Sequence, residues 1–354
     1  MKITQIMLAK GFGGAERLFV DLCISLAEEG QEVHAICVKD SKSSQILSQH
    51  AQIELDTLTV LGSWDPIAPL KLRQLFRKRK TELVQAHLAR GALIAGKACK
   101  ATSLPLVVTT HNYIDIKYYK NVTMLVTPTK DQYNYYLSKG VSENRLTIIN
   151  HFSPIIPVEK KCISDPPVLR IVSLGRLVKK KGFEVLINAF DELQNLTNSE
   201  CELIIGGAGP EENLLLTQIE SLKLHKKIKL RGWVDDVSDF LKDADIFVLP
   251  SLEEPFGIVV LEAMALGLPI ITTDTPGPLE MLEEKSAWFC KRGDASSLAG
   301  ALQLACDDLD ERSRKSTNAL VKFKQYFSKQ AVIPEFLALF DSLSPVKKKP
   351  SPRL

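Results

Sequence analysis

Short apolar runs and longer amphipathic stretches alternate along the first 150 residues. Residues 2–8 are a short apolar run typical of a buried strand, and residues 15–29 repeat apolar side chains near the 3.6-residue period of a helix. The same pattern continues to residue 150, with further strands at 32–38, 83–88, 106–111, 124–129 and 146–150 and a helix from about Gly91. Strands that alternate with helices predict a parallel sheet with helices on its faces.

The alternation stops at residues 153–167, which contain four prolines and little periodicity, and then resumes. The second series has strands at 170–175, 202–207, 227–233, 245–251 and 268–273, with helices over 181–193 and from Glu211 onward. We therefore predict an α/β protein with a first domain over 1–152, a linker over 153–167 and a second domain over 168–325. A C-terminal helix, at about 331–343, and a basic tail occupy 326–354.

Composition narrows the class of protein. The 354 residues are 45% hydrophobic and 25% charged, as in an average soluble protein, and a net charge of +3 does not indicate a nucleic-acid binder. The apolar run at the N-terminus is too short for a signal peptide or a membrane span. Seven cysteines without a CxxC spacing favour buried free thiols in a reducing cytosol over disulfides or a zinc site.

Two parallel-sheet domains place the loops after their strands around one cleft, where ligands bind in such sheets. The first such loop contains Gly11, Gly13 and Gly14. Without Cβ atoms the backbone can approach a phosphate, and the following helix offers free N–H groups. A plain tight turn is the alternative. The loop is not the dinucleotide fingerprint, because Glu16 occupies its sixth position, which argues against a nicotinamide dehydrogenase.

Two loops of the second domain have the same character. Arg176 and Lys181 follow its first strand, and two cations beside a glycine can neutralise a diphosphate, although a solvated basic loop is equally compatible. Residues 206–212, which include Gly207, can bring backbone near a ligand, and a turn before a helix explains them as well.

The most informative stretch is residues 250–282. A strand runs into Glu254, then Pro-Phe-Gly, then an apolar helix that contains Glu262, eight residues after Glu254. A carboxylate among apolar side chains is costly unless it is paired or meets a ligand, and carboxylates are usual partners of ribose hydroxyls. The N–H groups around residues 256–259 open a helix and can hold phosphate. The alternative is an acidic cap with one buried, satisfied glutamate.

This segment resembles the EX7E motif of retaining glycosyltransferases with the GT-B fold, in glycosyltransferase family four. The GGAER, GRLVKKKG, GGAGPEE, LRGWVDD and DADIFVLPS segments fall in that family's order, so the resemblance spans about residues 3–285. It implies two Rossmann-like domains that face a central cleft. The first would serve the acceptor and the second would bind a nucleotide-sugar donor.

The family also implies roles for individual residues. Glu262 would bind the donor ribose, Glu254 the hydroxyls of the transferred sugar, and Arg176 with Lys181 the diphosphate. His111, at the end of a first-domain strand, would contact the donor sugar or stabilise developing charge, and His87 would lie on the acceptor side. The remaining donor contacts would come from Gly13, Gly14, Gly207, Trp233, Val234, Phe256, Gly257 and Ile258.

The resemblance implies retention of anomeric configuration without a metal or other cofactor. A UDP-sugar is the expected co-substrate, and a donor phosphate oxygen would take the acceptor proton. Asp243 and Asp245 match the DxD text of metal-dependent transferases, but they lead into a strand and we interpret them as structural. Arg176, Lys181 and helix-end amides can supply positive potential in place of a metal.

The acceptor is indicated less directly. Residues 71–80 contain six cations mixed with apolar side chains, a composition that suits an anionic membrane surface or, alternatively, a solvated helix face. Family analogy favours lipopolysaccharide, capsule or glycolipid assembly at the inner face of the membrane. Two rival functions remain open at this stage: a nucleotide-sugar epimerase on the same fold, and a non-catalytic subunit that binds a nucleotide-sugar.

Overall fold

The computed structural model describes residues 1–159 and 163–344, and the chain divides into two compact units. Unit 1 comprises residues 1–154 together with the chain from Lys329 onward, and unit 2 comprises Ile155–Ser328. The basic tail after residue 344 and residues 160–162 of the predicted linker lie outside the described residues.

Unit 1 is built on a seven-stranded sheet in which all neighbouring strands are parallel, in the order β3-β2-β1-β4-β5-β6-β7. Every residue of β4 and β5 is buried, as expected for inner strands with helices on both faces, and the buried residues include the polar Gln85, His87 and Thr109. The strands are β1 (Lys2–Met7), β2 (Glu32–Val38), β3 (Ile53–Leu58), β4 (Leu83–His87), β5 (Leu106–Thr109), β6 (Met124–Thr127) and β7 (Leu146–Ile148).

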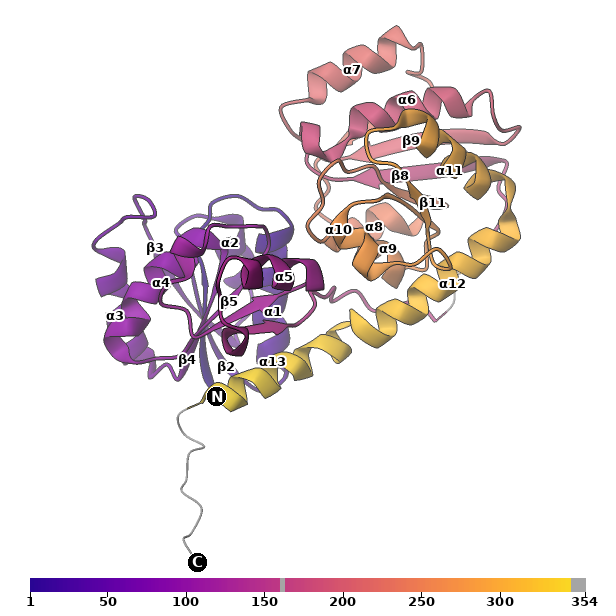
Figure 1. Ribbon diagram of the computed structural model, residues 1–354. Coiled ribbons are helices and arrows are strands. Elements are labelled where there is room, and N and C mark those ends of the chain that lie inside the picture. The colour runs from indigo at the N-terminus through magenta and orange to yellow at the C-terminus, as the bar shows by residue number, and fades with distance from the viewer. Residues whose placement is uncertain (160–162, 345–354) are drawn as a thin grey trace, which may run out of the picture. The chain divides into compact units, whose positions relative to one another are not determined.

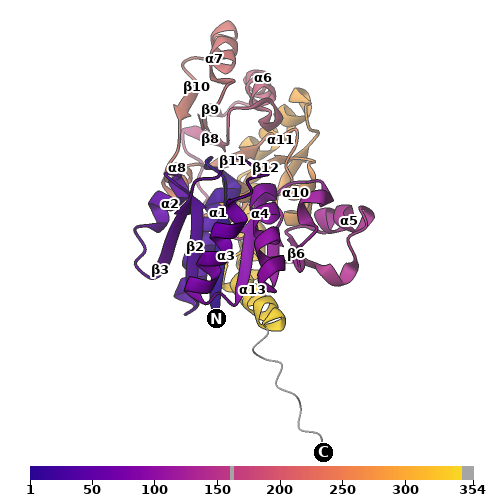
Figure 2. The same cartoon turned by 90° about the vertical axis from the view of Figure 1, so that its left-hand side faces the viewer.

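Helices cover both faces of this sheet, with α3 and α4 on one face and α1 and α13 on the other (Figure 1). Figure 2 shows α3 beside α4 from a second direction. The side chains of Ser41 and Thr129 accept the first free N–H groups of α2 and α5, as N-caps do. The helices are α1 (Gly14–Glu28), α2 (Lys42–Leu47), α3 (Ala68–Arg79), α4 (Leu88–Thr102), α5 (Lys130–Ser138) and α13 (Lys329–Leu343), with 3₁₀ turns η1 (Ile116–Tyr119) and η2 (Glu143–Arg145).

Unit 2 has a six-stranded parallel sheet in the order β10-β9-β8-β11-β12-β13. Its core forms two layers: α6, α7 and α11 pack on one face, and α8, α9 and α12 pack on the other. The strands are β8 (Val168–Leu174), β9 (Glu200–Gly206), β10 (Ile228–Gly232), β11 (Ile246–Leu249), β12 (Ile270–Thr273) and β13 (Trp288–Cys290). The helices are α6 (Phe183–Leu193), α7 (Glu212–Ser221), α8 (Val237–Lys242), α9 (Ile258–Ala265), α10 (Pro276–Met281), α11 (Ala295–Asp307) and α12 (Leu309–Tyr326), with the 3₁₀ turn η3 (Lys179–Lys181).

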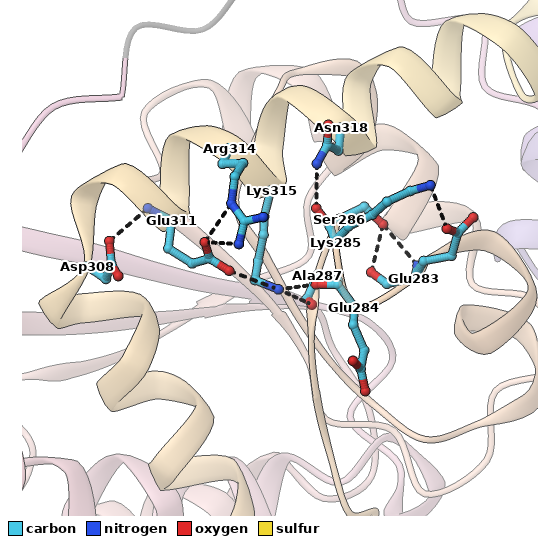
Figure 3. Close-up of polar contacts among 10 residues, drawn as sticks. All are labelled: Glu283, Glu284, Lys285, Ser286, Ala287, Asp308, Glu311, Arg314, Lys315 and Asn318. Atoms are coloured by element: carbon cyan, nitrogen blue, oxygen red, sulfur yellow. Dashed lines mark hydrogen bonds and ion pairs between the residues drawn. The ribbon is translucent and has the colours of Figure 1, made fainter.

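Helix α12 is held against the turn that precedes β13 by Lys315 (Figure 3). The Lys315 ammonium donates to the carbonyls of Glu284 and of Ala287, the latter at 3.1 Å, and lies 3.3 Å from the Glu311 carboxylate. Arg314 also donates to Glu311, and this contact lowers the pKa of the Glu311 carboxyl. The Lys315 side chain thereby provides hydrogen-bond donors for two backbone carbonyls of the turn that precedes β13.

The two predicted parallel sheets are confirmed, and so is the α/β class. The strands β3 and β13 and the short helix α2 were not predicted. Helix α4 begins at Leu88, three residues before the predicted start. The predicted C-terminal helix is α13, which belongs to unit 1. Among the described residues, no helix is both long enough and apolar enough to span a bilayer.

Candidate active site

Three loops of unit 2 converge at the carboxyl edge of its sheet. They follow β8, β9 and β11, which are adjacent in the order β9-β8-β11. The backbone N–H of Gly175 donates to the Gly206 carbonyl and that of Leu177 to the Ala208 carbonyl, both at 3.0 Å. On the other side, the N–H of Leu252 donates to the Lys180 carbonyl at 2.8 Å. Backbone hydrogen bonds therefore join all three loops into one surface.

Glycines allow this close approach. A Cβ on Gly207 would lie 1.8 Å from the Gly175 carbonyl oxygen, and a Cβ on Gly182 would lie 2.1 Å from the Pro250 oxygen. Both residues also have positive φ, at 135° and 69°, where side chains other than hydrogen are strained. Gly207 was predicted for its backbone approach to a ligand, and its nearest neighbour in the structure is another loop. Gly182 was not singled out from the sequence.

Lys181 and Glu254 come together across these loops. The Lys181 Nζ atom lies 2.5 Å from Glu254 Oε2, with side-chain exposures of 18% and 8%. The Ser251 hydroxyl donates to the same carboxylate oxygen at 3.3 Å. Lys181 and Glu254 were predicted for separate reasons, and nothing in their spacing indicated a direct contact. If either side chain moved away, the other would be left as an unpaired charge in a mostly buried position, which is costly. The ion pair therefore holds both side chains in place at the loop surface.

Arg176 and Glu262 are the other two charged residues predicted for the donor site in unit 2. Arg176 is exposed on the loop after β8, so its guanidinium reaches solvent rather than the Lys181–Glu254 pair. Glu262 lies on α9 and is half-buried, less enclosed than Leu261 and Ala263 on either side of it. The structure thus leaves Arg176 available to a ligand at this edge.

The segment between Glu254 and α9 is fixed by its backbone. Gly257 caps α9 with a φ of 97°. Phe256 is 4% exposed and packs in the core, so only its backbone is presented at the edge, and Ile258 begins the helix half-buried. The Gly277 N–H donates to the Glu254 carbonyl at 3.0 Å, and a Cβ on Gly277 would lie 2.3 Å from the Phe256 carbonyl oxygen. Gly277 was missed by sequence reasoning.

The loop after β10 presents one aromatic side chain. Trp233 is 47% exposed, and its indole N–H donates to Asp235 at 3.2 Å. Val234 points into the core near Gly206 and offers only its backbone at the surface. Asp245, the second aspartate of the DxD text, accepts the Arg170 backbone N–H at 2.8 Å beside β11, which is a structural role. Within residues 1–159 and 163–344, no three or more His, Cys, Asp or Glu side chains are arranged so that they could hold a metal ion.

Three histidines gather at the carboxyl edge of the unit 1 sheet. His87 ends β4, His111 follows β5 and His151 follows β7, with exposures of 0%, 9% and 2%. His87 Nδ1 lies 3.1 Å from His111 Nε2, and the ring centroids of His111 and His151 are 4.9 Å apart. Burial lowers the pKa of all three imidazoles, that of His111 to about 3, so the cluster is neutral at physiological pH.

A row of buried amides continues inward from His87. His87 Nε2 lies 3.4 Å from Gln5 Oε1, Gln5 donates to Gln85 at 2.8 Å, and Gln85 donates to the Thr109 hydroxyl at 2.7 Å. With this orientation Nε2 of His87 carries the proton and its Nδ1 accepts from His111. His111 then presents an unprotonated Nδ1. The sequence predicted His87 and His111 separately and missed His151 and the two glutamines.

A glutamate side chain already caps the N-terminus of α1, the helix that follows the glycine loop of unit 1. Gly13 is the N-cap of α1, and its N–H donates to the Glu16 carboxylate at 2.9 Å. Gly14 is the first residue of the helix. A Cβ on Gly13 would meet only that same carboxylate, at 3.5 Å. A phosphate at this helix end would therefore meet a negative charge unless the Glu16 side chain moves.

The backbone beside His87 is strained. Leu88 has a φ of 61°, which is rare for a branched, bulky residue. Strain of this kind persists where surrounding structure fixes it, and it clusters at functional sites. In unit 1 it sits where β4 turns into α4, directly after the histidine that contacts His111.

Comparison with known sequences and structures identifies the family. Two family models match the chain: Glycosyltransferase Family 4 over residues 12–152, and Glycosyl transferases group 1 over residues 160–321. The chain belongs to the family-four type of GT-B glycosyltransferases. The family's two-domain plan thus coincides with the two sheets described above, and the chain is a glycosyltransferase.

Relatives extend over the whole chain. The lipopolysaccharide core biosynthesis glycosyltransferases LpsE and LpsD of Rhizobium meliloti are 27% and 28% identical, over 97% and 96% of this chain and 99% and 98% of their own lengths. Among solved GT-B structures, Anabaena HepE in complex with UDP has a TM-score of 0.83 at 20% identity, covering 97% of this chain and 100% of HepE. The outer core galactosyltransferase WaaB has a TM-score of 0.74 at 16% identity, covering 97% and 100%.

Proposed function

We propose that this glycosyltransferase moves a hexose-type sugar from a nucleotide-diphospho-sugar to an acceptor hydroxyl with retention of configuration. The Lys181–Glu254 contact, at 2.5 Å, is the observation that carries this proposal. It places a cation suited to a diphosphate beside a carboxylate suited to sugar hydroxyls, on one surface built from three loops. In this proposal Arg176 joins Lys181 on the diphosphate and Glu262 binds the ribose.

The remaining donor contacts follow from the same surface. The backbone at Phe256, Gly257 and Ile258 lies at the start of α9 and would hold phosphate oxygens through helix-end N–H groups. Trp233, half exposed on the loop after β10, would border the base together with the Val234 backbone. Gly207 would allow the donor to approach the backbone after β9. On the unit 1 side, Gly13 and Gly14 would approach the donor phosphates once Glu16 has moved.

The proposed chemistry requires no metal and no protein nucleophile. As the glycosidic bond breaks, charge grows on the leaving diphosphate, and Arg176, Lys181 and the amides that open α9 stabilise it. A phosphate oxygen takes the acceptor proton on the same face of the sugar. Glu254, already paired with Lys181, orients sugar hydroxyls and does not attack the anomeric carbon.

His111 would act as a neutral partner of the sugar. Its depressed pKa keeps it uncharged, and the hydrogen bond to His87 leaves Nδ1 as an acceptor for a sugar hydroxyl. Charge on this ring is not needed for such a contact. His87 orients His111 in this arrangement and is a positioning residue, so the acceptor contact predicted for it from the sequence is a separate hypothesis.

The relatives supply the substrate classes of the proposal. LpsE and LpsD are named for lipopolysaccharide core biosynthesis, and HepE is solved with UDP and with UDP-glucose. We infer that the donor is a UDP-sugar and that the acceptor belongs to lipopolysaccharide, capsule or glycolipid assembly. The enzyme would then work in the cytoplasm, at the inner face of the membrane.

Two measurements test this function: a thermal-shift screen that identifies the donor, and a transfer assay that compares matched variants. Purified enzyme, with EDTA, is screened by thermal shift against UDP, GDP, ADP, CMP and dTDP and their sugars, because a ligand that binds only the folded state raises the melting temperature. With the donor so identified, Lys181→Met and Glu254→Gln should each lower the transfer rate by about 10²–10³-fold. Lys179→Met, on the same loop but exposed, is the control and should leave the rate unchanged.

The same assay separates the rivals. An inverted product by NMR would refute retention, and loss of all transfer in EDTA with rescue by Mn²⁺ would refute metal independence. Interconversion of the donor sugar without an acceptor would identify an epimerase. Nucleotide binding without turnover on any acceptor tried would favour a binding subunit.

A further inference from the structure

The segment that joins β3 to α3, together with the first turn of α3, exposes an unusual amount of apolar surface. Leu61, Trp64, Ile67 and Leu70 are 89%, 76%, 55% and 53% exposed, and all four lie within ten residues. We call these four side chains the apolar loop. Single exposed apolar residues are common on soluble proteins, but four large ones together mark an interaction surface.

The apolar loop is held in place by a buried carboxylate. Asp65 is 6% exposed, and its oxygens accept the backbone N–H groups of Leu61, Ile67 and Ala68 at 3.0, 2.8 and 2.9 Å. These hydrogen bonds lower the pKa of the Asp65 carboxyl, and the one from Leu61 contributes most. The Asp65 side chain is therefore charged at neutral pH. The exposure of the loop is therefore a fixed feature of the fold and not a frayed end.

Cations extend the same surface along α3. The helix buries Ala68, Pro69, Leu72 and Phe76 and turns Leu70, Lys71, Gln74, Arg77 and Lys78 outward, at the spacing of one helix face. Arg79 is used inside the unit, in ion pairs with Glu54 and Asp56. Across the described residues, the other five cations of 71–80 form no ion pair. They are Lys71, Arg73, Arg77, Lys78 and Lys80.

A further cation lies beside the tryptophan. Lys97 of α4 has its ammonium 5.5 Å from the centroid of the Trp64 ring, within cation–π range. The apolar loop is thus bordered by positive charge from two helices that pack together, α3 and α4. Its one carboxylate, Asp65, faces inward and contributes no negative charge to the outer surface.

Topology ties this surface to the site. The apolar loop leaves the sheet where β3 ends at Leu58, and strands of a parallel sheet end at one edge. His87 and His111 lie at that edge of the same unit. Whatever holds the apolar loop would therefore face the same edge of the unit 1 sheet as these histidines, on the side of the outermost strand β3.

We propose that the apolar loop and the outer face of α3 dock on an anionic phospholipid bilayer, with Trp64 in the headgroup region and the cations on the lipid phosphates. Indole rings favour that interface, and lysine and arginine near an anionic surface add to the affinity. A protein partner would need charge depletion at its centre, whereas here cations interleave with apolar groups. This rests on the proposed function, because it makes the acceptor a membrane lipid-linked glycan.

Vesicle binding by the full-length enzyme tests the proposal. Sucrose-loaded vesicles of phosphatidylcholine with 30% phosphatidylglycerol are expected to sediment the protein, and vesicles of phosphatidylcholine alone at least about tenfold less. Lys71→Glu with Arg77→Glu, and separately Trp64→Ser with Ile67→Ser, should each weaken binding about tenfold or more. The controls are Lys223→Glu with Lys226→Glu, and Ile156→Ser with Leu304→Ser, equally exposed pairs in unit 2 that should bind like the wild type.

Insertion has its own readout. Acyl chains brominated near the headgroup should quench Trp64 fluorescence, and Trp64→Phe should remove that quenching although two tryptophans remain. Equal binding to neutral vesicles, binding unaffected by either surface pair, or no quenching would overturn the proposal. So would a dimer in sedimentation that Trp64→Ser with Ile67→Ser dissolves, because a second copy would then cover the loop.

Failure here and failure of the proposed function are distinguishable. The surface variants leave the Lys181–Glu254 surface intact, so the thermal shift by nucleotide should be unchanged in all of them. Loss of vesicle binding with normal nucleotide binding and normal transfer to a water-soluble acceptor concerns only the docking surface. If the wild-type enzyme bound vesicles but no nucleotide, the assignment of the donor site to unit 2 would instead be refuted.

Discussion

The two units share a parallel sheet and a polar carboxyl edge, yet they build that edge by opposite means. In unit 2 the loops are pressed together, and Gly207, Gly182 and Gly277 each leave no room for a Cβ beside a neighbouring backbone. In unit 1 the glycine loop is open, and a Cβ on Gly13 would meet only a flexible side chain. Order at the unit 1 edge comes instead from buried imidazoles and amides.

The contrast separates two ways of fixing a functional group. Backbone packing in unit 2 sets the positions of Lys181 and Glu254 before any ligand arrives. In unit 1, the orientation of His111 depends on a chain of hydrogen bonds through neutral side chains, which pH and amide orientation can alter. Glycine substitutions should therefore act mainly on unit 2, and protonation mainly on unit 1.

Among single substitutions, the largest effect on stability is expected for Gly207→Ala. The new methyl would lie 1.8 Å from the Gly175 oxygen at a φ of 135°, so the loops after β8 and β9 would have to separate. We expect a loss of more than about 3 kcal/mol in the free energy of unfolding of unit 2, measured by urea denaturation.

Gly300→Ala is the matched control in the same unit. Gly300 lies inside α11 with no atom within 4 Å of its Cβ position, so alanine should be neutral or stabilise by up to about 1 kcal/mol. If Gly207→Ala were as well tolerated as Gly300→Ala, the close stacking of the two loops would be wrong.

Protonation of the three buried histidines of unit 1 is expected to lower the free energy of unfolding. The folded-state pKa values of His87, His111 and His151 are depressed, so the unfolded chain binds protons first as pH falls below about 6.5. Stability is therefore present above that pH and is lost toward the folded values, by about 2 kcal/mol per histidine between pH 7 and pH 5. Urea denaturation of the wild type at both pH values measures this loss together with that of His34, whose pKa burial also lowers, and with an opposite contribution from Asp21, whose pKa burial raises to about 7.

His151→Gln isolates one member of the cluster. It should reduce the pH 7 to pH 5 loss by about 2 kcal/mol, because glutamine takes up no proton. His225→Gln is the control, since that imidazole is exposed in the folded protein as it is in the unfolded chain. An unchanged pH dependence in His151→Gln would mean that its ring already takes up a proton in the folded state.

The predictable part of this molecule is what local pattern encodes. Apolar runs such as β5 revealed the strands, because these segments are buried on both faces of the sheet. The strand β3 was missed since it is an edge strand, and its alternating IELDTL sequence is only partly buried. Its period of two was a signal that could have been used.

Contacts between distant residues were beyond the sequence. Lys181 and Glu254 are 73 positions apart, and His87 and His111 are 24 apart, so no local spacing reveals that each pair touches. Their residue types were nevertheless found, because each follows a strand at the edge where ligands bind. Gly182 and Gly277 were missed because their need for glycine comes from another loop's backbone.

Gly13→Ala should have the smallest effect on the free energy of unfolding, and it tests directly whether the glycine loop contacts the donor. Its φ of −133° suits alanine and only Glu16 is near, so loss of the glycine N-cap should cost no more than about 1 kcal/mol by urea denaturation. If the loop approaches donor phosphates, the methyl should still weaken nucleotide affinity or transfer at least tenfold. Glu16→Gln, which keeps a capping acceptor without the charge, should leave affinity equal or higher. Wild-type affinity in Gly13→Ala would make the loop a plain turn, and the donor would then be held by unit 2 alone.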